Sequence, residues 1–164
     1  MALRFGLCCI FTREPIRFRA ATARGLSTLS RPRQLAKLSE ICLSNARNLL
    51  AAVQAVSRMG IGAFRVLSPI FPRFTHPEVG YGLDDLPDAP SIAAIFAQVN
   101  DTRRKHDIRL SFHPDQFITL SSLRADVVDN SLRELEYQGL VAEMIGAEVI
   151  NIHGGGAFGD KSSA

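Results

Sequence analysis

Two of the four histidines in the sequence have the spacing of a metal site. His113 directly follows the run IRLSF (108–112), and His153 directly follows the run EVINI (148–152). If both runs are parallel strands, their carboxyl ends meet at one edge and the two imidazoles lie side by side. Imidazole is a common protein ligand for zinc, manganese and iron. One strand-end histidine is more often a hydrogen-bonded structural residue, but the pair favours a shared metal.

Two further features could belong to the same site. His76 lies within the long segment PRFTHPEVGYG (72–82), where a third site residue and a surface residue are equally good interpretations. Three glycines follow His153 directly. Because glycine lets a backbone pass close to a ligand, we expect the first two, Gly154 and Gly155, to approach a phosphate.

The segment HPDQF (113–117) could also contact nucleic acid. Gln116 carries an amide that can pair with the edge of a base, and Phe117 carries a ring that can stack or wedge between bases. The alternative for Phe117 is packing beneath its own loop.

The amino-terminal part of the chain is strongly basic. Residues 1–37 contain eight Lys or Arg and one acidic residue, whereas the remainder contains eleven basic and fifteen acidic residues. Such an excess of arginine attracts phosphate backbones. A solvated loop and an organelle-targeting segment are alternatives, although the strand-like run RFGLCCIF (4–11) does not suit a targeting helix. The candidate phosphate-binding residues here are Arg13, Arg17, Arg19 and Arg24.

These side chains must be positioned by regular elements, and the sequence predicts strands alternating with helices. Predicted strands lie at 4–11, 63–67, 108–112 and 148–152. Apolar residues at helical spacing predict helices at 34–60, 91–105 and 125–146. The order predicts an α/β fold with a parallel sheet and right-handed crossovers.

The spacing of the strands suggests a barrel. Arg65 to Ser111 is 46 residues and Ser111 to Asn151 is 40. Eight such units would somewhat exceed the ~250 residues typical of a TIM (β/α)8 barrel. We therefore expect residues 1–164 to be a single domain that holds about the first four β/α units, the amino-terminal half of a longer barrel.

Composition narrows the class of protein further. Hydrophobic residues make up 46% of the chain, which is typical of a globular domain, and no apolar run is long enough to span a membrane. The three cysteines have no metal-type spacing, so we expect reduced core residues in a cytosol-like compartment.

At these residues the sequence resembles the UV damage endonucleases, DNA repair nucleases whose barrel is similar to that of endonuclease IV. The resemblance covers nearly the whole chain. It is carried by TARGLSTLSR (22–31), LSEICLSNARNLL (38–50), GIGAFRVLSPIFPRFTHPEVGYGLDDLP (60–87), LSFHPDQFITLSS (110–122) and LRELEYQGLVAEMIGAEVINIHGGGAFGDK (132–161).

The resemblance implies a TIM barrel with a cluster of divalent metals at its carboxyl-terminal rim, commonly manganese, with magnesium, zinc or cobalt as alternatives. It implies nicking of the damaged strand immediately 5′ of UV photoproducts and other lesions. His113 and His153 match metal ligands of the family, and His76 matches a histidine at or near the metals. Gln116 and Phe117 match the pair that probes the duplex, where the family often has tyrosine in the second place.

The sequence departs from the family pattern in three respects. Leu67 replaces a polar residue, and the first strand offers Leu7 to Cys9 where a tyrosine or similar group is usual. The family's remaining carboxylate and histidine ligands lie in later strands, and manganese favours carboxylate oxygens. We therefore expect the 164-residue chain to be inactive alone.

The implied partner is damaged double-stranded DNA, and the full-length protein is expected to be a monomer in the cytoplasm, associated with the nucleoid, with organelle targeting as an alternative. Two rival functions remain. One is a metal-dependent sugar isomerase, which would also need rim histidines but neither a basic segment nor an exposed Gln-Phe pair. The other is a non-catalytic DNA-binding fragment.

Overall fold

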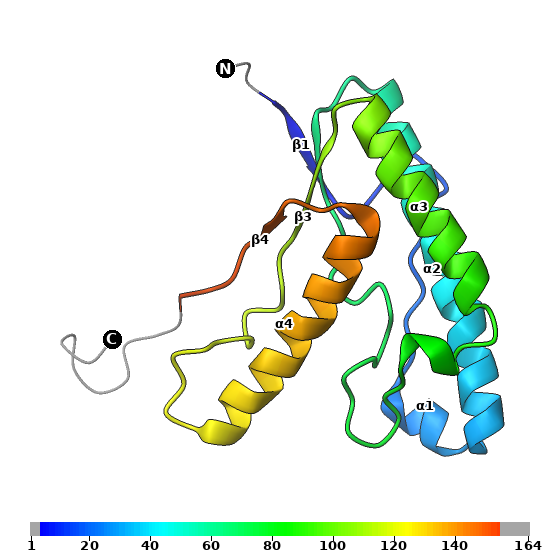
Figure 1. The fold of residues 1–164 in the computed structure, drawn as a ribbon, viewed down its shortest axis with the longest axis vertical. Helices are drawn as coiled ribbons and strands as arrows, with labels where there is room; N and C mark the ends of the chain where they lie inside the picture. The colour runs from blue at the N-terminus through cyan, green and yellow to red at the C-terminus, as the bar shows by residue number, and fades with distance from the viewer. Residues whose placement is uncertain (1–3, 155–164) are drawn as a thin grey trace.

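The computed structural model describes residues 4–154, and in it four parallel strands form one sheet in the order β1-β2-β3-β4 (Figure 1). The predicted alternation of strands and helices is confirmed, while the short helices α1 and η1 were not predicted. The strands are β1 (Gly6–Cys8), β2 (Ala63–Arg65), β3 (Arg109–Phe112) and β4 (Val149–Ile150). The helices are α1 (Ala23–Ser27), α2 (Arg31–Arg58), the 3-10 helix η1 (Leu83–Asp85), α3 (Ala89–Lys105) and α4 (Ala125–Ile145).

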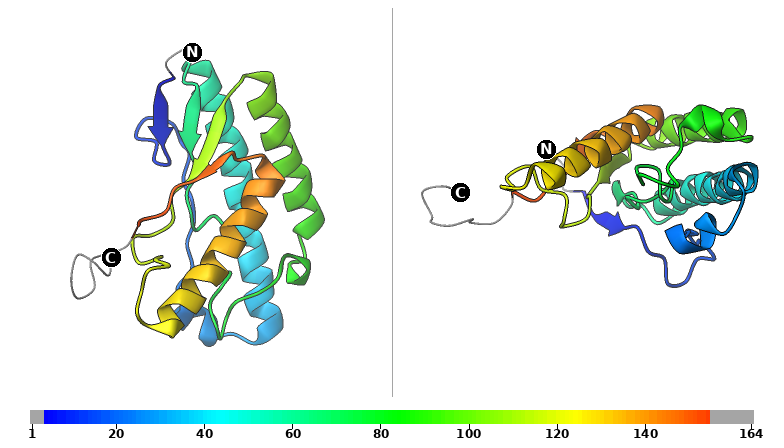
Figure 2. Two further views of the ribbon diagram at one scale, coloured as in Figure 1. Left: turned by 60° about the vertical axis from the view of Figure 1, so that its left-hand side comes forward. Right: turned by 90° about the horizontal axis from the view of Figure 1, so that it is seen from below.

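The three long helices lie against one face of the sheet, as the two views in Figure 2 show. Leu7, Phe64 and Leu110 are register partners on that face, and the last two are fully buried against the helices. Because side chains alternate along a strand, the neighbouring positions point to the opposite face. These positions are Cys8, Arg65, Ser111 and Val149.

The predicted helices are confirmed to within a few residues, because their sequences specify where they end. The chain leaves α2 through Gly60, which has a φ of 67°, and it leaves α4 through Gly146, which has a φ of 69°. Left-handed backbone of this kind favours glycine. A Cβ on Gly146 would also collide with Asn100 and Arg103 of α3, so this end of α4 packs closely against α3.

A buried amide ties two loops to α2. The side chain of Asn45 is fully buried. Its Nδ2 donates to the carbonyl oxygens of Arg19 and Ile70, each at 2.9 Å, and its Oδ1 accepts from the backbone N–H of Arg19 at 2.7 Å. The loop after β1 and the loop after β2 are therefore joined to the same helix.

The strands are shorter than predicted, and the first one is not buried. The structure has three paired residues where the sequence predicted a strand over 4–11. Phe5 and Ile10 are 74% and 76% exposed. The expectation that the cysteines lie in the core is wrong for Cys8, which is exposed, and for Cys9, which is partly exposed. Only one side of β1 is paired within residues 4–154, so its apolar sequence alone does not bury it.

Cys42 does lie in the core, on α2. Its Sγ is 3.2 Å from the hydroxyl oxygen of Tyr81. Burial raises the pKa of the Cys42 thiol to about 11, although the Tyr81 hydrogen bond opposes the shift. The thiol is therefore neutral near pH 8. Within residues 4–154, no helix combines the length and apolar character needed to cross a lipid bilayer.

We predict that a thiol reagent at pH 8 modifies Cys8 and Cys9 in the folded protein and leaves Cys42 unmodified, because a neutral, buried thiol is a poor nucleophile. The measurement is titration with Ellman's reagent, with a Cys42→Ser variant as the control. In the native state, the variant and the wild type should react with the same number of thiols. After unfolding, the wild type should show one more reactive thiol than in its native state, and the variant should show no additional one. Equal reaction rates for all three thiols in the native protein would contradict the prediction.

Candidate functional site

The two strand-end histidines lie side by side. The register pairs Ser111 with Val149 and Phe112 with Ile150, so β3 and β4 run toward the same edge of the sheet. His113 follows β3 directly, and His153 lies three residues beyond β4. Their ring centroids are 4.8 Å apart with an interplanar angle of 86°. The predicted adjacency of the two imidazoles is therefore confirmed.

A hydrogen bond sets the tautomer of His113. Its Nδ1 lies 3.0 Å from the carbonyl oxygen of Pro114. A carbonyl oxygen can only accept a hydrogen bond, so Nδ1 is the donor, and in the neutral imidazole Nε2 then carries the lone pair. A backbone carbonyl that orients a histidine in this way is a common feature around metal ligands.

Two hydroxyl groups fix the backbone next to His113. The Ser68 hydroxyl, in the loop after β2, donates to the carbonyl oxygen of His113 at 2.6 Å. Tyr137 of α4 donates its hydroxyl to the carbonyl oxygen of Ser68 and accepts from the backbone N–H of Phe71, both at 3.0 Å. Burial raises the pKa of Tyr137 above its ordinary value, so the phenol remains a donor. Sequence reasoning missed Tyr137.

His76 has a different environment. Its Nδ1 accepts from the backbone N–H groups of Glu78, at 3.2 Å, and Val79, at 3.4 Å. The backbone N–H of Gly80 donates to the carbonyl oxygen of His76 at 2.8 Å, and a Cβ on Gly80 would collide with that oxygen. Within residues 4–154, no three His, Cys, Asp or Glu side chains are placed to hold one metal ion. The proposed role of His76 as a third ligand stays a prediction.

The loop after β3 presents Phe117 to solvent. Asp115 shapes the turn, because its Oδ1 accepts from the backbone N–H of Phe117 at 3.0 Å and its carbonyl oxygen accepts from Ile118 at 2.9 Å. Phe117 is 74% exposed, and Gln116 is also exposed. The alternative in which Phe117 packs beneath its loop is therefore contradicted.

The basic amino-terminal segment divides into two groups. One Nη of Arg17 donates to the carbonyl oxygens of Phe11, Glu14 and Ile16, and Arg19 pairs with Glu40 at 2.7 Å. These two arginines hold the protein's own structure. The side chains of Arg13 and Arg24 are exposed and have no hydrogen-bond or ion-pair partner within residues 4–154. Gly154 is exposed with open space around its Cα, and Gly155 lies outside the described residues.

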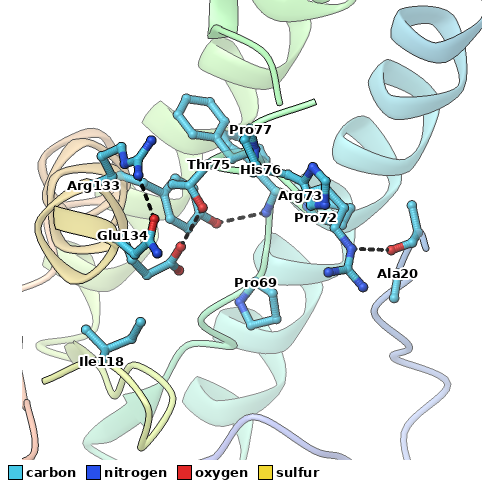
Figure 3. Close-up of a pocket in the computed structure, with 15 residues that line it drawn as sticks. Ala20, Pro69, Pro72, Arg73, Thr75, His76, Pro77, Ile118, Arg133 and Glu134 are labelled. Atoms are coloured by element: carbon cyan, nitrogen blue, oxygen red, sulfur yellow. Dashed lines mark hydrogen bonds between the residues drawn. The ribbon is translucent and has the colours of Figure 1, made fainter. Parts of the chain in front are cut away.

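A cavity of about 580 Å³ opens beside this edge of the sheet (Figure 3). It is bordered by the loop after β1, the loop after β2 and the helix α4. Two of its lining residues, Pro69 and Ile118, are the chain neighbours of Ser68 and Phe117. The cavity therefore adjoins the elements that carry the candidate site.

Comparison with known proteins assigns the family. The family model described as "UV-endonuclease UvdE" matches residues 3–164. The chain belongs to the UvdE family. The resemblance found in the motifs is thereby confirmed.

The UvdE relatives include "UV DNA damage endonuclease" of Bacillus velezensis, 31% identical over 171 residues, which cover 100% of this chain and 51% of the relative. "UV-damage endonuclease" of Neurospora crassa is 32% identical over 133 residues, or 77% of this chain and 20% of that protein. The chain thus spans about half the length of the first relative and about a fifth of the second.

The fold of this UvdE chain also matches a solved structure, "Crystal Structure of SacUVDE". The TM-score is 0.81 at 26% sequence identity, and the match covers 99% of this chain and 53% of that one. The predicted fold class, about four β/α units of a barrel, is confirmed by this match and by the four parallel strands.

We predict that Ser68→Ala lowers the free energy of unfolding by about 1 kcal/mol, because a hydrogen bond to the His113 carbonyl is lost. It should also shift the imidazole NMR signals of His113. Ser57→Ala is the matched control, since no other residue within 4–154 bonds to the Ser57 hydroxyl. If Ser68→Ala moves the His113 signals no more than Ser57→Ala does, the hydroxyl does not position the histidine.

Proposed function

We propose that this chain is part of a DNA repair endonuclease that cuts the damaged strand immediately 5′ of UV photoproducts by metal-dependent hydrolysis of a phosphodiester bond. The observation that carries the proposal is the pair of imidazoles, 4.8 Å apart, on a chain of the UvdE family. Two relatives are named as endonucleases for UV damage. The nearby exposed aromatic ring supports DNA rather than a sugar as the substrate.

The two histidines fit one side of a divalent metal site. Within residues 4–154, Nε2 of His113 has no hydrogen-bond partner and can face a metal ion, and the imidazole of His153 lies beside it on an exposed segment. A manganese site also favours carboxylate oxygens, which other residues of the complete protein would supply. A divalent ion bound there would supply Lewis-acid stabilisation of the charge that develops on the phosphate. His113 and His153 would hold and orient that ion, which we propose to be manganese.

Recognition of damage would fall to the loop after β3. Asp115 holds the turn that projects Phe117, and an aromatic side chain can wedge between base steps that are already weakened. Opening a damaged stack costs less than opening an intact one. A site of this kind responds to the deformability of the duplex and so accepts lesions of different chemistry. We propose that the complete protein acts as a monomer on the DNA of the nucleoid.

We predict that His153→Ala lowers manganese-dependent nicking more than about 100-fold, since metal ions supply several kcal/mol of transition-state stabilisation. The assay uses a chimera that joins this chain to the carboxyl-terminal half of the Bacillus velezensis relative. Its substrate is UV-irradiated supercoiled plasmid. His106→Ala is the control, because His106 is exposed at the end of α3.

The control should cut normally, and His153→Ala should still bind irradiated DNA. Full nicking by His153→Ala would remove that histidine from the metal site. The unsubstituted chimera is also tested on an oligonucleotide that contains a lesion. If it cuts neither that oligonucleotide nor the irradiated plasmid, the proposed activity itself is wrong.

We predict that Phe117→Ala reduces the preference for irradiated over intact duplex by roughly 1–3 kcal/mol, the range seen for aromatic stacking on a base. Binding to both duplexes is measured by fluorescence anisotropy. Phe5→Ala is a matched control, since Phe5 and Phe117 are each 74% exposed and Phe5 precedes β1 at the other end of the sheet. Phe117→Tyr should keep the preference. Equal losses in Phe117→Ala and Phe5→Ala would show that Phe117 does not probe the duplex.

A further inference from the structure

The cavity beside the histidine edge contains two arginines that the sequence analysis did not select. Arg73 comes from the loop after β2, and Arg133 comes from α4 (Figure 3). Residues 60 positions apart in the sequence therefore bring cationic groups to one concave surface. Because the cavity also touches Pro69 and Ile118, it lies next to the loops that carry Ser68 and Phe117.

Arg73 is held in an unusual conformation. Its φ is 64°, in the left-handed region that residues other than glycine rarely adopt. Its Nε donates to the carbonyl oxygen of Ala21 at 3.0 Å, which anchors the guanidinium across the cavity. Its two Nη groups have no hydrogen-bond partner within residues 4–154. Backbone strain of this kind is concentrated at functional sites.

Arg133 also lacks a carboxylate partner within the described part of the chain. One Nη donates to the side-chain oxygen of Asn130 at 2.6 Å, and the other Nη has no partner there. Seven other arginines among the same residues form an ion pair with Asp or Glu, whereas Arg73 and Arg133, like Arg13 and Arg24, form none. The charges of Arg73 and Arg133 are therefore not compensated by direct ion pairs.

The lining of the cavity carries more positive than negative charge, because Arg73 and Arg133 outnumber its one carboxylate. Glu134 is the acidic residue of the lining and keeps its negative charge, and its two oxygens accept from the Thr75 hydroxyl at 2.9 Å and the Gln138 amide at 3.4 Å. Phe74 and Tyr137 form an aromatic wall with ring centroids 4.9 Å apart. Arg73 and Arg133 are both exposed, so a ligand can reach each guanidinium from solvent.

We propose that Arg73 and Arg133 each contact a phosphate of the DNA backbone at this cavity, beside the histidine pair, and that neither contact needs a metal ion. Guanidinium groups suit this ligand because they donate two parallel hydrogen bonds to phosphate oxygens. The inference rests on the proposed function in that DNA is taken as the substrate. It gives the backbone a fixed contact beside Phe117, whereas Arg17 and Arg19 are engaged within the protein.

The test is the salt dependence of binding to a short, undamaged, labelled duplex in EDTA, measured with the 164-residue chain. Arg73→Gln and Arg133→Gln should each weaken binding about tenfold at low salt, as expected for loss of a charged hydrogen bond. The plot of log K against log salt has a negative slope. Each single variant should make that slope shallower by about 1, and the double variant should make it shallower by about 2. Arg47→Gln and Arg104→Gln, at exposed positions of α2 and α3, are the controls and should keep the slope.

Variants that fold, by circular dichroism, and bind like the two controls would overturn the inference. If a variant fails to fold, the unsubstituted chain decides the matter. In that chain the Nε–H NMR signal of Arg73 should shift on titration with the duplex, and an unshifted signal at saturation would overturn the proposal.

The proposed endonuclease activity can fail separately. Duplex binding with the expected slopes, in a chimera that never nicks irradiated plasmid, would support the phosphate contacts and reject the nuclease. In the alternative outcome, the chimera nicks irradiated plasmid while its Arg73→Gln and Arg133→Gln variants keep the wild-type salt dependence of duplex binding. That result would support the nuclease and reject the phosphate contacts. No duplex binding by the unsubstituted chain would overturn the phosphate contacts.

Discussion

The geometry of the candidate site depends on the parallel pairing of β3 with β4. Only two residue pairs are in register, but the pairing is extended at both ends. Glu148 donates its backbone N–H to Leu110, and its carboxylate is held by Arg103 at 2.9 Å and by Arg109 at 3.1 Å. At the other end, Asn151 donates to the carbonyl oxygen of Phe112. These contacts on both sides of the paired residues fix the register of β4 on β3. As a result, His153 lies beside His113.

The elements that the sequence predicted well are those that local physical rules determine. Apolar periodicity and the terminal glycine determine α4, and adjacency to a strand end was enough to place His113 beside His153. The contacts that escaped prediction join distant parts of the chain, as when Tyr137 reaches Ser68 across 69 residues. Nor does an apolar run indicate which face is covered, and for this reason Cys8 was wrongly assigned to the core. Likewise, a count of arginines does not distinguish Arg17, which binds carbonyl groups, from one that is free to bind DNA.

The candidate site has rigid parts and exposed parts. The histidines sit at or just beyond strand ends, and His113 is fixed further by the Ser68 and Pro114 contacts. Phe117 instead stands on a turn held by Asp115 and reaches into solvent. The proposed chemistry at a phosphate requires fixed geometry, whereas the proposed probe of duplex stacking has to reach beyond the protein surface. The segment HPDQF contains one residue of each kind, the partly buried His113 and the exposed Phe117.

The buried Asn45 amide has a thermodynamic consequence for any ligand of the neighbouring cavity. By joining the backbone at Arg19 and at Ile70 to one helix, it restrains the two loops that border the cavity on either side. Ordering a backbone residue costs about 1–2 kcal/mol of conformational entropy. For these loops that entropy is lost when the domain folds and not when a ligand arrives, so more of the contact energy remains available as affinity.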